Sequence, residues 1–156
     1  MTPKIESIQS KLLVGIRVKT TLTTDNPVVY WKPFKMGLSE IENAITDKFY
    51  SVQIMDKMDG PFTPDTTFEK WAAAEVSHLG NVPNGMETLR LPEGKYAIFT
   101  HKGTPASFPQ TMQYIFGEWI PNSEYKVDNR PHFEVMDKDY RVDDENAEEL
   151  VYVPIR

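Results

Sequence analysis

The sequence predicts an α+β domain made of two βαββ units related by a pseudo-twofold axis, with antiparallel sheets, two helices and a central ligand groove. Both halves carry the same order of signals, namely a strand, a helix opened by a proline, and two more strands. The spacing also agrees, because the last strand of each half starts some forty to forty-five residues after its helix proline, Pro27 or Pro105. At 156 residues the chain fits a single domain, expected over residues 1–156.

The first half opens with a strand over residues 10–22, which are rich in branched side chains. Asp25 or Asn26 then provides a helix cap, and Pro27 fits the first helical turn. Pro33 falls in the second turn, so we expect this helix to be short or kinked.

Further strands follow on either side of the middle of the chain. Residues 49–55 predict one strand. Residues 68–79 contain three alanines that favour a helix, but only some ten residues separate the flanking turn signals, so we interpret them as a strand. The turn at 92–94 separates two short strands, of which 96–101 gives the stronger pattern.

The second half continues with a helix and ends with two strands. Apolar residues recur at helical spacing after the cap residue Thr104 until Pro121 stops the helix. Residues 131–136 and 150–155 predict the last two strands. Pro154 lacks a backbone donor, which favours an edge position for the final strand.

Composition excludes several classes of function. The absence of cysteine removes disulfides, thiolate metal sites and a cysteine nucleophile, and suits the cytoplasm. A net charge of −6 argues against direct nucleic-acid binding, and the acidic run 137–149 predicts a solvated loop. The sequence has neither a signal-peptide core nor an apolar stretch of membrane length.

Cofactor and metal sites also lack support in the sequence. His78, His101 and His132 do not show the close pairing typical of zinc ligands. The glycines form no phosphate-binding or dinucleotide pattern. We therefore expect no metal and no cofactor.

Several segments together resemble the GyrI-like small-molecule-binding domain, which is also found at the C-terminus of AraC-type and MerR-type multidrug-responsive transcription factors. They are, in order, KWAAAEVSHL, VPNGMETLRLPEGKYAIFTHKGTP, FGEWIP, RPHFEVM and VYVPI. The resemblance implies a tandem βαββ fold whose central groove takes flat, hydrophobic, often cationic compounds. The family's strand motif Phe-Glu-x-Tyr places its groove glutamate at Glu134, and Met136 stands where the tyrosine is usual. Because the first predicted strand begins near residue 11, we expect a stand-alone form without a preceding helix-turn-helix.

Two glutamates are the leading candidates for the site. Alternation along the strand puts His132, Glu134 and Met136 on one face, and a carboxylate in an apolar groove favours a cationic guest. Glu75 shares a strand face with Trp71 and could line the same groove, although an exposed position is equally compatible with the pattern.

Aromatic side chains are the candidate walls of the groove. Tyr96, Trp119 and Trp31 are candidate ligand contacts, together with Trp71 beside Glu75. A position in the hydrophobic core is at least as compatible with these rings, and Phe108 fits the core better. His132 could add a hydrogen bond beside the glutamate.

The expected function is binding of hydrophobic, aromatic or cationic small molecules, leading to sequestration of a toxic compound or to signalling. The resemblance also admits a hydrolase that opens the cyclopropane ring of DNA-alkylating natural products, with Glu134 and Glu75 as general acid and base. A third alternative, suggested by the family name alone, is a protein that inhibits a DNA topoisomerase. The sequence identifies no protein partner.

Overall fold

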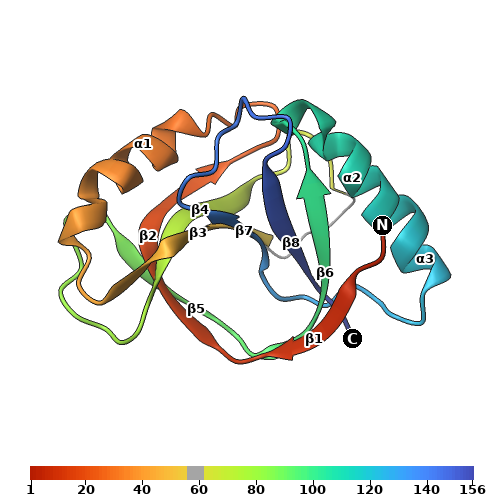
Figure 1. Cartoon of the computed structure of the whole chain (residues 1–156), viewed down its shortest axis with the longest axis horizontal. Helices are drawn as coiled ribbons and strands as arrows, with labels where there is room; N and C mark the ends of the chain where they lie inside the picture. The colour runs from red at the N-terminus through yellow and green to blue at the C-terminus, as the bar shows by residue number, and fades with distance from the viewer. Residues whose placement is uncertain (56–61) are drawn as a thin grey trace.

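A computed structural model describes residues 1–55 and 62–156, which form one antiparallel sheet with helices on one of its faces (Figure 1). The eight described strands are β1 (Lys4–Ile8), β2 (Lys11–Thr20), β3 (Ala44–Met55), β4 (Phe68–Val76), β5 (Glu87–Leu91), β6 (Gly94–Lys102), β7 (His132–Asp137) and β8 (Glu148–Pro154). The helices are α1 (Val28–Gly37), α2 (Phe108–Tyr114) and α3 (Ile120–Asn122).

The strand order shows the duplication. It runs β1-β6-β8-β7-β3-β4-β2-β5, so β6-β8-β7 of the second half mirrors β2-β4-β3 of the first about the β3–β7 pair. The two outer strands are exchanged, because β1 precedes β2 yet pairs with β6, and β5 precedes β6 yet pairs with β2. The predicted tandem βαββ fold is confirmed, while β1 was missed because its residues are mostly exposed and lack alternation.

The sheet curls, and its two faces pack differently. The inner face holds one apolar cluster around Phe133, Trp71 and Leu13. The outer face is covered by α1 at one end and α2–α3 at the other, and each helix packs on its own apolar cluster. Because the sheet bends away from the helices, the helices diverge over β3 and β7, the central strands (Figure 1).

The second helix is less regular than expected. A 3-10 turn at Pro105–Ser107 leads into α2, and a π-helical segment at Ile115–Trp119 joins α2 to α3. Pro121 lies within α3, whose last residue is Asn122, so the helix stops one residue later than predicted. The first helix contains Pro33 and has ten residues, in agreement with the expected short helix.

The edge position predicted for the final strand is wrong. Strand β8 lies between β6 and β7, and the sheet edges are β1 and β5. The proline is tolerated because Pro154 is the last residue of β8, where the missing donor interrupts no interior ladder bond. Among the described residues, no helix is long and apolar enough to cross a membrane.

Candidate functional site

The floor of the site is formed by the central strands on the face that carries the helices. Ser51 of β3 pairs with Glu134 of β7 on one side and with Ala72 of β4 on the other, so the three side chains share that face. Phe133 and Val135 point to the opposite face and belong to the inner cluster. The alternation predicted for this strand is therefore confirmed.

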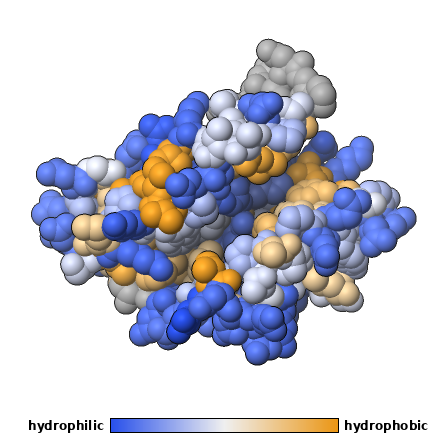
Figure 2. Space-filling model, turned by 90° about the horizontal axis from the view of Figure 1, so that it is seen from above, coloured by the Kyte–Doolittle hydropathy of each residue, from blue (hydrophilic) through white to orange (hydrophobic). Residues whose placement is uncertain are grey.

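A cavity of about 860 Å³ lies above this floor, between α1, the start of α2 and the connection from β7 to β8. Figure 2 looks onto this side of the molecule and shows a hollow with hydrophobic side chains on its flanks and hydrophilic ones near its centre. The aromatic and thioether side chains of its wall are Tyr30, Trp31, Met36, Phe49, Phe108, Met136 and Tyr140. Its volume suits a drug-sized ligand.

Glu134 is the buried charge of this cavity. Only 8% of the residue is exposed, and its Oε1 accepts one hydrogen bond, from Nε2 of Gln53 at 3.3 Å. Burial raises the pKa of Glu134, while the charge of Lys70 and the Gln53 hydrogen bond act in the opposite direction. The carboxylate therefore lacks a bonded counter-ion among the described residues, which favours a positively charged guest.

Glu149 is a second carboxyl group in the same cavity. It lies on β8 opposite Met136, one strand away from Glu134. Burial and the charge of Glu134 raise its pKa to about 7, against the smaller opposing effects of Lys70 and the Tyr140 hydroxyl. The two acids thus interact, and the charge of the cavity changes near neutral pH.

The wall contributed by α1 is aromatic. Trp31 meets Phe34 edge to face at a centroid distance of 5.6 Å and tilts against Phe49 at 6.4 Å. The buried hydroxyl of Tyr30 donates to Asp25, just before the helix. Burial and the Asp25 carboxylate raise the pKa of Tyr30, so this side chain stays a neutral donor. These ring faces suit a flat or cationic ligand.

The opposite wall combines a ring with a buried imidazole. Nδ1 of His101 lies 2.6 Å from Oγ1 of Thr111 on α2, and the imidazole meets Phe108 edge to face at 5.1 Å. Nε2 of His101 is buried without a hydrogen-bond partner among the described residues. The helix and the sheet are thus joined by a polar contact at this end of the cavity.

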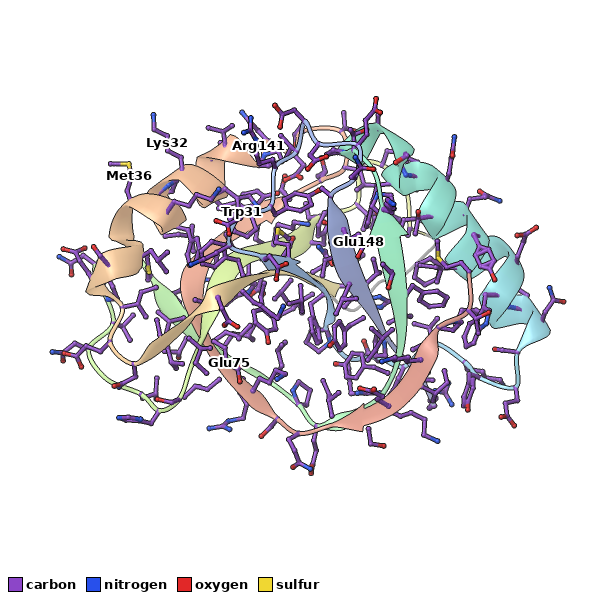
Figure 3. The ribbon with its side chains drawn as sticks, viewed as in Figure 1. Trp31, Lys32, Met36, Glu75, Arg141 and Glu148 are labelled. Carbon is purple, nitrogen blue, oxygen red and sulfur yellow. The ribbon has the colours of Figure 1, made fainter. Side chains whose placement is uncertain are left out.

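Glu75 does not join Glu134. It lies on the inner face of the sheet, where it lines a separate cavity of about 290 Å³. Oε1 of Glu75 accepts a hydrogen bond from the Tyr50 hydroxyl at 3.1 Å and lies 3.6 Å from Nζ of Lys11. Figure 3 shows Trp31 between α1 and the sheet and Glu75 on the sheet's other side. The two glutamates, which the sequence allowed in one groove, therefore line separate cavities.

The other predicted contacts divide between the cavity and the core. Trp31 and Met136 line the cavity with Glu134. Tyr96 and Trp71 are buried in the inner cluster, which explains why neither reaches the helix side.

Trp119 and His132 also lie outside the cavity wall. Trp119 packs against Phe99 and stacks on Tyr125 in the cluster under α3. His132 lies beside Phe116 at 6.1 Å, and burial, with a smaller effect of Arg130, lowers its pKa to about 4. His132 is therefore neutral at physiological pH.

Sequence reasoning missed several members of the site. Glu149 was assigned to a solvated acidic loop, although β8 begins at Glu148 and brings Glu149 into the floor. Phe108 was assigned to the core but also lines the cavity, as do Lys70 and His101. Extending the predicted last strand, residues 150–155, by one residue would have placed Glu149 on the same face as Val151 and Val153. No group of three metal-binding side chains occurs in the part of the chain that the structure describes.

Known proteins share both sequence and fold with this chain. The transcriptional regulator BrlR of Pseudomonas aeruginosa is 32% identical over 93 residues, which is 59% of this chain and 34% of BrlR. The match therefore spans about a third of the regulator's length. It relates the chain to a transcription regulator but covers only part of that protein.

Two solved structures show the same fold. SAV2435 bound to tetraphenylphosphonium superimposes with a TM-score of 0.76 at 16% identity, covering 100% of this chain and 94% of that one. A hydrolase encoded by lin2189 from Listeria innocua gives a TM-score of 0.64 at 9% identity, covering 99% of this chain and 92% of that one. The profile of the GyrI-like small molecule binding domain matches residues 1–156. The chain therefore belongs to the GyrI-like family of small-molecule-binding domains.

Proposed function

We propose that the cavity binds hydrophobic aromatic cations, and that the protein acts by sequestering such compounds or by signalling their presence. The observation that carries this proposal is Glu134, a buried carboxylate that accepts a hydrogen bond from the neutral amide of Gln53 and has no ion-pair partner among the described residues. A cation over this group would recover part of the cost of its burial. Trp31 and Phe49 would add ring contacts to a flat guest.

The cation in SAV2435 offers a suitable probe. Titration calorimetry with tetraphenylphosphonium should show saturable binding to the wild-type chain, and weaker binding of the neutral compound triphenylphosphine oxide. Glu134→Gln keeps the shape of the side chain and removes its charge, so it should weaken tetraphenylphosphonium binding at least roughly tenfold.

Glu75→Gln is the matched control for this titration. It removes an equal charge from the opposite face of the sheet, and should change tetraphenylphosphonium affinity less than about twofold. Equal affinity of the wild type and Glu134→Gln, or an equal loss in Glu75→Gln, would contradict the proposed site.

The pair of carboxyl groups also supports a second candidate, a hydrolase of reactive cyclopropanes. Glu149 has a pKa of about 7 beside Glu134, so the two groups could divide the roles of acid and base. In this reaction water adds across the strained carbon–carbon bond, with hydroxyl going to one carbon and a proton to the other. Glu75, which the sequence analysis paired with Glu134 for these two roles, lines the other cavity.

Mass spectrometry distinguishes the two candidates. The hydrolase requires that a cyclopropane-bearing alkylator gains the mass of water with multiple turnovers, and that Glu134→Gln and Glu149→Gln each abolish them. Stoichiometric binding without a hydrated product would exclude the hydrolase for that compound and leave the binding function.

A further inference from the structure

Lys70 is a basic side chain on the floor of the cavity. It lies on β4 and pairs in register with Gln53 of β3, whose amide donates to Glu134. Lys70 therefore borders the residue that contacts the central carboxylate. It lines the same cavity as Glu134 and Glu149, and it is half-buried.

The other lysines of the cavity wall have a different position. Lys32 and Lys35 on α1, and Lys138 after β7, are exposed at the rim. Figure 3 shows Lys32 extending away from the sheet. Charges in contact with bulk water are screened, whereas charges on a partly enclosed floor act on one another strongly.

Three buried or half-buried charged side chains among the described residues of the floor strands line the cavity, namely the carboxylates of Glu134 and Glu149 and the ammonium group of Lys70. A further half-buried carboxylate, Asp25, lies in the wall just before α1, where it accepts the hydrogen bond of the Tyr30 hydroxyl. The charge of Lys70 lowers the pKa of both floor acids, so its ammonium group interacts with Glu134 and with Glu149. When both floor acids are ionised, these three side chains carry two negative charges and one positive charge, so one negative charge has no partner among them.

We propose that Lys70 is a specificity-determining residue: its ammonium group balances one of the two floor carboxylates, so that the groove accepts aromatic monocations and discriminates against dications. This inference rests on the proposed cation-binding function. A monocation completes the charge balance of the floor. A dication of the same shape brings its second charge into a floor that is already neutral and into the field of Lys70.

A matched pair of probes tests the charge rule. The singly and doubly methylated bipyridinium ions share one flat skeleton and carry one and two positive charges. Calorimetry at about pH 8.5, above the pKa of Glu149, should show a wild-type preference for the monocation. Lys70→Met should raise monocation affinity roughly tenfold and dication affinity roughly a hundredfold, because the lost repulsion scales with ligand charge.

Two variants separate charge from other effects. Lys70→Arg keeps the charge and should keep the wild-type ratio of the two affinities. Lys126→Met removes an equal charge from an exposed position outside both cavities and should shift the ratio less than about twofold at about 150 mM salt. Lys70→Gln replaces Lys70→Met if the methionine variant fails to fold. Tetraphenylphosphonium gives a second readout, with roughly tenfold tighter binding to Lys70→Met.

The outcomes distinguish this inference from the function on which it rests. An unchanged ratio in Lys70→Met together with unchanged tetraphenylphosphonium affinity overturns the role of Lys70 and leaves cation binding intact. A shift of equal size in Lys126→Met overturns it as well. If the wild type binds none of the three cations, both the proposed function and the inference fail.

Discussion

Glu134 and Glu75 lie on opposite faces of the same sheet, and their charges meet different surroundings. Glu75 has the Tyr50 hydroxyl and the Lys11 ammonium group beside it, and about a quarter of its side chain is exposed. Glu134 is buried and has one neutral hydrogen-bond donor. The helix side of the sheet thus keeps a carboxylate without an ion-pair partner among the described residues above an open cavity, whereas Glu75 on the inner side finds its partners within the fold.

Substitutions on the two faces of β7 should lower the free energy of unfolding by very different amounts. Phe133 is fully buried and stacks on Tyr152 at 4.5 Å, so Phe133→Ala should lower the free energy of unfolding by about 3–5 kcal/mol. Met136 faces the cavity and is partly exposed, so Met136→Ala should cost about 1 kcal/mol. Urea unfolding measures both values. Equal losses would show that the helix side is packed as tightly as the inner side.

The second prediction concerns the free energy of unfolding that is lost when Glu149 ionises in the cavity. The folded-state pKa of Glu149, about 7, lies above its ordinary value of 4.5, so its contribution to stability is full below pH 4.5 and is lost as the pH rises through 7. Glu149→Gln should therefore raise the free energy of unfolding by roughly 1–3 kcal/mol near pH 8 and by much less near pH 4.

The neighbouring residue provides the control for this pH effect. Glu148 is exposed, and Glu148→Gln should change the free energy of unfolding by less than about 0.5 kcal/mol at either pH. Urea titrations of the two variants at both pH values make the comparison. A gain in Glu149→Gln that is equal at the two pH values would contradict the assigned ionisation.

The smallest expected effect is the pH dependence of ligand binding. Between about pH 6 and pH 8 the tetraphenylphosphonium affinity of the wild type should rise up to about tenfold, as Glu149 loses its proton in the cavity. Glu149→Gln should flatten this part of the profile, and Glu75→Gln should leave it unchanged. A wild-type profile that is flat over this range would exclude Glu149 from the cation site.

The duplicated fold could be predicted from the sequence because each half repeats the same local signals. The face occupied by Glu134 also followed from alternation within a single strand. Which side chains of two different strands share a face could not be predicted, because this depends on the register between the strands. Ala72, not Ala73, pairs with Ser51 and so shares the face of Glu134. A one-residue difference in register changes the face of every side chain. This dependence is why the sequence left open whether Glu75 faces the same groove as Glu134.

Which side chains line the cavity could not be predicted, because this depends on where the strands end and on how the helices lie over the sheet. Glu149 lies within an acidic run, and nothing in its composition marks the start of β8 at Glu148. Trp31 and Phe108 both occupy apolar helix stripes, and only the divergence of the helices over the curled sheet decides which rings border open space. Tyr96 has an equally aromatic context but lies on the inner face.

The most direct test is to locate the bound cation. Tetraphenylarsonium replaces the phosphorus of the probe with arsenic, whose anomalous scattering marks the centre of the cation in a crystal of the complex. We expect a single arsenic peak in the larger cavity, above Glu134 and beside Trp31. A peak in the cavity of Glu75, or only peaks on the outer surface, would contradict it.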